Sequence, residues 1–200
     1  MQAEQRTPEW YAARAGKLTA SKFAAVLGPK GGRATYMREV VFERASGMAK
    51  HEVSSKSLAW GTDVEGFGLD AYTLSTGNII APSPFVLHPV YDFIGASPDG
   101  LVGVDGGVES KCPHSEAVHV LTWLEGMPDD HTAQVQGNMA VTGRAWWDFI
   151  SYDPRQAEPL RLYVQRIPRD DAYIARLVGA LRQFNDEANE MLAHLMRKAA

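Results

Sequence analysis

Three residues that can do chemistry together, Asp99, Glu109 and Lys111, lie in the stretch SPDGLVGVDGGVESKC at residues 97–112. Side chains on a strand alternate between its two faces, so Glu109 and Lys111 point the same way if this run is a strand. Residues 105–107, DGG, are a typical hairpin turn, and a three-residue turn there puts Asp99 on the same face. The pattern therefore predicts that two carboxylates and one ammonium converge beside a hairpin.

The register of this hairpin decides which side chains share a face. With the turn at 105–107, Lys111 lies opposite Leu101. A second set of residues then packs on the other side of the hairpin: Val102, Val104, Val108 and Cys112. A two-residue turn would reverse the two faces, so the interpretation depends on the turn.

Such a cluster suits the hydrolysis of a phosphodiester. Carboxylate oxygens, with the backbone carbonyl of Ser110 as a further candidate ligand, select a hard cation such as Mg²⁺ or Mn²⁺. The cation polarises a phosphoryl oxygen and lowers the pKa of a bound water, while an adjacent lysine orients or deprotonates that water. The alternative is a turn aspartate followed by a surface Glu–Lys pair on an edge strand, because this three-residue pattern is short and degenerate.

The elements that must position these residues can be predicted from apolar periodicity and turn residues. Helices are predicted at 19–27, 35–46, 57–76, 130–142 and from 170 to the C-terminus. Strands are predicted at 84–95 (interrupted at Pro89), 101–104, 108–112, 146–152 and 160–167. The glycine-rich, basic stretch 28–34 is predicted to be a mobile loop. This order indicates a mixed α/β domain with a central β-sheet and a long C-terminal helix.

The composition is that of a globular protein with one domain, residues 1–200. Apolar residues make up 45% and charged residues 22%, and no apolar run is long enough to cross a membrane. The single cysteine, Cys112, and an N-terminus without the layout of a secretory signal fit a reducing cytoplasm. The net charge of −4 argues against indiscriminate binding to a polyanion, although residues 1–50 hold nine Lys or Arg and four Glu.

The order Asp99, Glu109, Lys111 on a hairpin resembles the active site of the PD-(D/E)XK nuclease superfamily. Longer blocks are similar to the phage lambda exonuclease family, also called YqaJ-like viral recombinases. These blocks are EWYAARAGKLTASKFAAVLG (9–28), SLAWGTDVE (57–65), SPDGLVGVDGGVESKCP (97–113), TAQVQGNMAVTG (132–143) and WWDFISYDPR (146–155). The resemblance covers nearly the whole chain, and it implies a restriction-endonuclease-like core in which helices flank a central mixed β-sheet.

The resemblance also implies a function. Members of this family are Mg²⁺-dependent exonucleases, with Mn²⁺ expected to substitute, that degrade the 5′-ended strand of linear double-stranded DNA. They release 5′-mononucleotides processively and leave 3′ single-stranded tails for recombination. A homotrimeric ring around DNA and a single-strand annealing protein as partner are implied as well. The expected setting is a phage or prophage protein in the cytoplasm of a bacterial cell.

The family pattern assigns roles to several positions. Asp99 and Glu109 match the metal ligands, and Lys111 matches the catalytic lysine. Glu65, in the AWGTDVE block, matches an additional acidic residue at the metal, and Gln134 matches a glutamine at the edge of the active site. Without the resemblance, Glu65 would be interpreted as a solvated helix residue and Gln134 as a surface amide.

A second group of positions matches the DNA-end contacts of the family. Arg14, Ser21 and Ser97 fall where the terminal 5′-phosphate is held, and Leu58 matches an apolar residue that parts the end base pairs. The chemistry is suitable, because arginine grips phosphate with a forked, charge-assisted contact and the amides at a helix start favour an anion. The alternatives are a surface arginine, a helix cap, a turn serine and a buried helix leucine.

Other readings of the sequence stay open. An endonuclease or resolvase on the same fold, or a non-catalytic scaffold that binds DNA ends, would share most of these features. Four of the five tryptophans are interpreted first as core residues and second as base-stacking residues: Trp10, Trp60, Trp146 and Trp147. The chain departs from the family pattern mainly at 115–131 and at 28–34, so the DNA contacts of those loops are not predicted.

Overall fold

The computed structural model describes residues 5–49 and 55–199, and all structural statements below refer to them. The helices are α1 (Pro8–Arg14), α2 (Phe23–Leu27), α3 (Lys30–Ser46), α4 (Lys56–Thr76), α5 (Glu116–Glu125), α6 (Thr132–Thr142) and α7 (Asp171–Ala199). The strands are β1 (Leu18–Thr19), β2 (Ile80–Ala81), β3 (Val86–Leu87), β4 (Ile94–Ala96), β5 (Gly100–Val102), β6 (Gly106–Lys111), β7 (Trp146–Tyr152) and β8 (Leu162–Pro168). Short 3₁₀ turns lie at Ala20–Lys22, Asp129–His131 and Glu158–Leu160.

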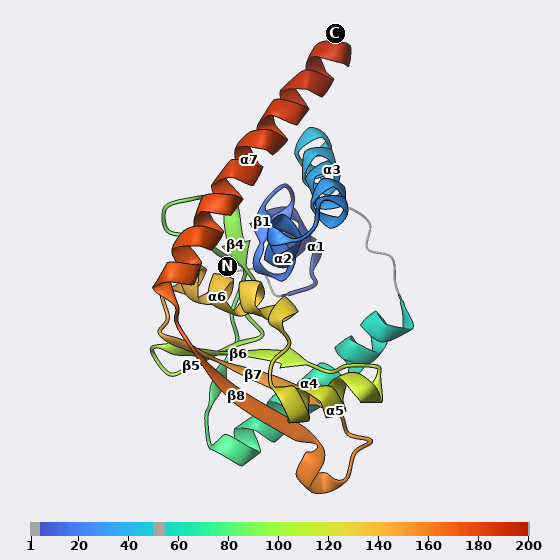
Figure 1. The fold of residues 1–200 in the computed structure, drawn as a ribbon, viewed down its shortest axis with the longest axis vertical. Helices are drawn as coiled ribbons and strands as arrows, with labels where there is room; N and C mark the ends of the chain where they lie inside the picture. Colours follow the sequence, from blue (N-terminus) through green and yellow to red (C-terminus); the bar gives the residue numbers. More distant parts are fainter. Residues whose placement is uncertain (1–4, 50–54, 200) are drawn as a thin grey trace.

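The central element is a five-stranded mixed sheet in the order β2-β5-β6-β7-β8 (Figure 1). β6 and β7 are parallel, and every other pair of neighbours is antiparallel. Parallel neighbours need a long crossover connection, and here the chain supplies it through α5 and α6. β6 is therefore the middle strand, hydrogen-bonded on both edges.

A smaller sheet, in the order β1-β4-β3, stands with α1, α2 and α3 apart from the central sheet (Figure 1). The long helix α7 runs beside α3 and ends far from the sheets. Phe23, Leu181 and Phe184 are fully buried where these elements meet. α6 contacts both this part and the central sheet, so one helix joins the two.

The two faces of the central sheet are covered by different helices. On one face Tyr72 of α4 packs against Val108 and Ile150. On the other face Met139 of α6 packs against Trp147, which is fully buried. Asp148 is also buried, and it accepts hydrogen bonds from Tyr72 and from Arg166. The sheet is thus enclosed on both sides, as the central strands of an α/β domain require.

The predicted hairpin forms, but its register differs from the prediction. Leu101 lies opposite Gly107 and not opposite Lys111, and the turn occupies residues 103–105 with Gly103 in the left-handed region (φ 55°). Gly106 and Gly107, which were predicted to form the turn, belong to β6 instead. A Cβ on Gly107 would lie 2.4 Å from the Trp147 ring, and one on Gly106 would lie 2.0 Å from the Trp146 ring. They are therefore glycines because two indole rings pack over the strand.

The shift preserves the faces, because it moves the register by an even number of residues. Val102 and Val108 are buried on the α4 face, as predicted. Val104 is not packed there: it lies in the turn and is 92% exposed. Cys112 is half-buried. Continuing the observed register places Asp99 opposite Glu109, so the two acids lie on the same face as predicted, although the turn was misplaced.

Other boundaries also differ from the predictions. The helix predicted at 19–27 is divided into β1, a 3₁₀ turn and α2, because residues 18–19 pair with β4. The loop predicted at 28–34 is mostly the first part of α3, where Arg33 forms an ion pair with Glu187 of α7 (2.7 Å). The strand predicted at 84–95 is two short strands, and α1 and α5 were not predicted. Among the described residues, no helix is long and apolar enough to cross a membrane.

Candidate active site

Asp99 and Glu109 are placed by the hairpin. Glu109 is on β6, its side chain only 1% exposed, and Asp99 directly precedes β5. The backbone N–H of Ser110 donates a hydrogen bond to Asp99 Oδ2 (2.7 Å). The main chain of β6 therefore fixes the carboxylate of Asp99 beside that of Glu109. The sequence prediction that these two acids converge is confirmed.

Lys111 and Gln134 complete a closed set of contacts around Glu109. Lys111 Nζ donates to Glu109 Oε1 (2.6 Å) and to Gln134 Oε1 (3.2 Å). Gln134 Nε2 donates to the same Glu109 oxygen (2.5 Å). Each of the three side chains thus holds the other two, and the orientation of the lysine ammonium is fixed.

Asn138 is a site residue that the sequence analysis missed. Its Nδ2 donates to Glu109 Oε2 (3.0 Å), so α6 contacts both oxygens of that carboxylate. Asn138 lies one helical turn after Gln134, and this i, i+4 spacing on a predicted helix was available in the sequence. Gln136, between them, points elsewhere: its Nε2 donates to Pro168 O, and its Oε1 accepts from Asp170 N.

Glu65 reaches the same region from α4. It lines a cavity of about 260 Å³ together with Ser110 and Lys111. Its carboxylate accepts a hydrogen bond from Arg6 Nη2 at 2.5 Å, a contact that no sequence pattern indicated. The family-based expectation that Glu65 lies at the site, rather than on a solvated helix face, agrees with this geometry.

The charges in the site shift its pKa values. Burial, and then the negative charge of Glu109, raise the pKa of Asp99 well above its ordinary value. Burial lowers the pKa of Lys111, but Glu109, Asp99 and Glu65 outweigh it and the net shift is upward. Three acids face one lysine here, so the site has an excess of negative charge that favours a cation.

The residues present fit a hard divalent cation, although they do not form a ready-made cage. Within residues 5–49 and 55–199, no three His, Cys, Asp or Glu side chains are grouped as a metal site. The donors are nevertheless oxygen atoms, as Mg²⁺ prefers, and the buried Oδ1 of Asn138 behind Glu109 has no hydrogen-bond partner. That Asp99, Glu109, Glu65 and the carbonyl of Ser110 are the ligands stays a prediction.

The residues predicted to hold a 5′-phosphate lie near one another. Arg14 Nη1 donates to Ser97 Oγ (2.6 Å), and Trp10 Nε1 donates to the same oxygen (3.1 Å). The Arg14 guanidinium lies over the Trp10 ring, 4.0 Å from its centroid. Arg14 and Ser21 both line a cavity of about 100 Å³, which Lys17 and Lys22 also border. Ser21 lies in the 3₁₀ turn, not at the start of the predicted helix.

Other predicted residues are less informative. Leu58 lies on α4, but its side chain is outside the described part of the structure. Trp147 is a core residue, as expected. Trp60 and His114 contact each other edge to face, with ring centroids 6.0 Å apart. His114 belongs to the segment that follows β6 after Lys111, and Trp60 of α4 contacts it there.

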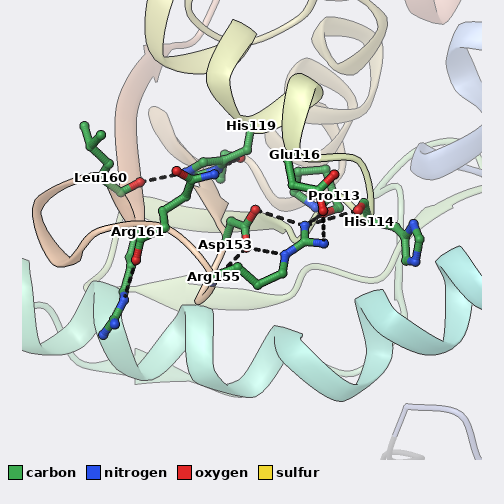
Figure 2. A network of polar contacts seen from close by, with 10 residues as sticks. Pro113, His114, Glu116, His119, Asp153, Arg155, Leu160 and Arg161 are labelled. Carbon is green, nitrogen blue, oxygen red and sulfur yellow. Dashed lines mark hydrogen bonds and ion pairs between the residues drawn. The ribbon is translucent and has the colours of Figure 1, made fainter.

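Arg155 holds that segment in place (Figure 2). Its Nη2 donates to the backbone carbonyl of His114 (3.1 Å), and its Nη1 donates to Glu116 (2.6 Å). Two further bonds join it to Asp153, from Nε to Oδ1 (2.8 Å) and from Nη2 to Oδ2 (2.9 Å). The guanidinium also lies 4.5 Å from the Trp60 ring centroid. One side chain therefore connects α4, the segment after β6 and the β7–β8 connection.

Comparisons with known proteins agree with this fold and site. The family model described as the YqaJ-like viral recombinase domain matches residues 9–145. An alkaline exonuclease from Laribacter hongkongensis, LHK-Exo, is 38% identical and has a TM-score of 0.91 over 96% of this chain and 98% of that chain. The structure of LHK-Exo in complex with dAMP gives 39% identity and a TM-score of 0.92 at the same coverage.

A more distant structure shares the fold. A phage related exonuclease from Haemophilus somnus 129PT is 15% identical, with a TM-score of 0.66 over 92% of this chain and 96% of that chain. A search of curated proteins found no match. The predicted PD-(D/E)XK-type core, with its mixed sheet, flanking helices and long C-terminal helix, is confirmed by these likenesses. The chain therefore belongs to the YqaJ-like viral recombinase family, the lambda exonuclease type of the PD-(D/E)XK superfamily.

Proposed function

We propose that this protein is a Mg²⁺-dependent exonuclease of the lambda exonuclease type. It degrades the 5′-ended strand of linear double-stranded DNA, releases 5′-mononucleotides and leaves 3′ single-stranded tails. Membership of the family supports nuclease activity, and so does the likeness to an alkaline exonuclease whose structure was also determined with dAMP. Mn²⁺ is expected to replace Mg²⁺.

The observation that carries this proposal is the arrangement of Glu109 and Lys111 on the middle strand. β6 is hydrogen-bonded on both edges, and Gln134 and Asn138 hold the Glu109 carboxylate from α6. A catalytic group must be held in position before the reaction begins, and this pair is held by a rigid strand and by a helix. A surface Glu–Lys pair on an edge strand would be neither buried nor shared with two amides.

Each residue has a defined task in the proposed reaction. A Mg²⁺ ion held by Asp99, Glu109 and Glu65 would polarise the phosphoryl group and make water more acidic. The raised pKa of Lys111 keeps its Nζ an ammonium, which orients the attacking water by donating to it, and its positive charge offsets the charge that develops on the phosphate. Gln134 keeps the ammonium in place. The N–H of Ser110 keeps the Asp99 carboxylate in place.

The experiment that tests this function uses a linear duplex labelled at its 5′ ends. We expect Mg²⁺ to cause release of labelled 5′-mononucleotides, and EDTA to prevent it. A covalently closed circular duplex should stay intact, because an exonuclease needs an end. Cutting of the circle would support an endonuclease or resolvase instead. Binding of ends without nucleotide release would support a non-catalytic scaffold.

The cavity lined by Arg14 and Ser21 would set the direction of degradation by binding the terminal 5′-phosphate. We expect Arg14→Ala to abolish the preference of the enzyme for a 5′-phosphate over a 5′-hydroxyl, because it removes the guanidinium that contacts Ser97. A charge-assisted contact of this kind contributes about 1.5–3 kcal/mol, so KM on phosphorylated ends should rise roughly ten- to a hundredfold. KM on hydroxyl ends should change little, which serves as the internal control. An unchanged preference would place the phosphate elsewhere.

The assembly and partners are further parts of the proposal. A homotrimeric ring around DNA would explain processive degradation, because DNA cannot leave a closed ring sideways. It would also let a chain of net charge −4 bind a polyanion through a local positive channel. The exposed 3′ strand would pass to a single-strand annealing protein during recombination. We place this activity in the cytoplasm of a bacterial cell, on DNA of a phage or prophage.

A further inference from the structure

The segment 5–7, which we call the N-terminal strap, contacts the candidate site at two points that the proposed function does not use. Gln5 Nε2 donates to the backbone carbonyls of Pro98 (2.8 Å) and Ser83 (3.3 Å). Arg6 Nη2 donates to Glu65 Oε2 (2.5 Å). Consecutive residues therefore touch the turn that precedes Asp99 and the helix that carries Glu65.

The backbone of the strap adopts a conformation that disfavours arginine. Arg6 has φ 68°, and no other residue except glycines has a positive φ in the described chain. The left-handed region costs a residue with a side chain about 1–2 kcal/mol. The contacts of Gln5 hold the strap on one side. On the other, Thr7 Oγ1 caps α1 by accepting from Trp10 N (3.3 Å). Strain of this kind is retained where neighbouring contacts fix the conformation, and it is common at functional sites.

The Arg6 side chain stands at the cavity that leads to the catalytic lysine. It lines the cavity of about 260 Å³ together with Glu65, Ser110 and Lys111, and it is 50% exposed. Arg6 and Lys111 supply the positive charge among the described residues that line this cavity. Within the part of the chain that the structure describes, the contact of Arg6 with Glu65 uses Nη2, and Nε and Nη1 donate to no protein acceptor.

We propose that Arg6 is a substrate-binding residue whose guanidinium contacts a backbone phosphate of the strand that is being degraded. Glu65 is its partner while the cavity holds no DNA. A forked guanidinium fits carboxylate and phosphate equally well, so the same side chain can exchange one anion for the other. The inference rests on the proposed function, because it takes DNA as the substrate and Glu65 as a ligand for the cation.

The exchange follows from the charges in the cavity. A Glu65 carboxylate that also serves a divalent cation holds Arg6 less strongly, because the two positive charges repel each other. A phosphate that enters the cavity then offers Arg6 an anion that Arg6 does not share with the cation. The exposed ion pair with Glu65 contributes little to stability by itself, so the exchange costs little. Gln5 is the positioning residue, because its bond to Pro98 keeps the strap at the cavity.

The test measures binding of a 5′-phosphorylated linear duplex by fluorescence anisotropy, over a range of salt concentrations, with Mg²⁺ or with EDTA. Lys111→Ala serves as the parent, so that the DNA is not consumed. Arg6→Gly removes the side chain and suits the positive φ, so a loss of binding cannot be assigned to added backbone strain. Arg6→Lys keeps the charge without the fork. Arg197→Ala removes one arginine at the exposed outer end of α7.

In Mg²⁺ we expect Arg6→Gly to weaken binding about tenfold, as loss of one charge-assisted contact implies. The slope of log K against log salt should fall in magnitude by about 1, because one phosphate contact is lost. Arg6→Lys should restore the slope, and Arg197→Ala should leave it unchanged. Melting temperatures in EDTA should match the parent, which checks that all variants fold.

Two results would overturn the inference. An unchanged slope for Arg6→Gly means that Arg6 does not contact phosphate. Tighter binding by that variant means that Arg6 only shields Glu65. The proposed function is judged separately, by release of nucleotides from the unmodified protein. If nucleotides are released and the slope is unchanged, only the role of Arg6 is wrong; if the unmodified protein releases no nucleotides, both proposals fail.

Discussion

Lys111→Ala is expected to lose hydrolysis while it keeps DNA binding. The lysine ammonium stands 2.6 Å from Glu109 and 3.2 Å from Gln134, so its position is fixed before any substrate arrives. Loss of one group that stabilises the charge developing in the transition state lowers kcat about 10²–10³-fold. Single-turnover release of nucleotides from a linear duplex measures this loss. Anisotropy with the same duplex should give a dissociation constant within a few-fold of the unmodified protein.

The matched controls separate chemistry from charge and from folding. Lys198→Ala, at the exposed end of α7, removes the same charge and should leave kcat unchanged. Lys111→Arg keeps a positive charge but replaces the compact ammonium with a larger planar group that does not fit the contacts to Glu109 and Gln134, so its kcat should stay low. The Glu109 carboxylate keeps the bonds from Gln134 and Asn138, so Lys111→Ala should still fold. Full activity of this variant would remove Lys111 from the mechanism.

Arg155→Ala should produce the largest loss of stability among the substitutions considered. It leaves the fully buried carboxylate of Asp153 without its ion pair and releases the segment that follows β6 (Figure 2). Removing one partner of a buried pair costs about 3–5 kcal/mol, and the one-third exposure of Arg155 reduces our expectation to about 2–3 kcal/mol. Urea unfolding measures the change. Arg161→Ala, in the same connection, removes a side-chain hydrogen bond to Gln156 O and should change stability little.

The loss should depend on pH in a defined direction. Burial raises the pKa of Asp153, but its bonds with Arg155 outweigh this, so the net pKa is below the ordinary value of 3.8. A carboxyl with a lowered pKa stabilises the folded state above its ordinary pKa and loses this contribution as the pH falls through the lowered value. The difference in free energy of unfolding between the unmodified protein and Arg155→Ala should therefore be largest near pH 7 and should become smaller below about pH 4. A difference that grows in acid would contradict the pairing.

Much of the fold was predictable because its signals are local. The WWDFISY segment is a strand over 146–152, as predicted, because its aromatic residues and Ile150 favour a strand. α7 was predicted from apolar residues at three- and four-residue spacing. The helix at 116–125 was missed, since its apolar residues do not form one buried face: His119 and Thr122 are its buried members.

The candidate site was likewise predictable only where its signals are local or belong to the family pattern. Asp99, Glu109 and Lys111 were found from spacing along the chain, and Glu65 and Gln134 from the family pattern. The turn was misplaced because Gly106 and Gly107 look like turn residues, whereas they accommodate tryptophans from a strand 40 positions later in the chain. The contact between Arg6 and Glu65 joins positions 59 apart, so no local pattern could have indicated it.

The turn at Ser97 and Asp99 carries one more consequence. Ser97 is held by Trp10 and Arg14, whereas Asp99 belongs to the acidic cluster two residues later. Two residues of extended chain span at most about 7 Å, the scale of a single nucleotide step. In the proposed function, the residue that would anchor a strand end and the residue that would serve its cleavage are therefore joined by a covalent spacer about as long as one nucleotide. The size of the excised unit would then be set by the polypeptide backbone, whatever the base sequence of the DNA.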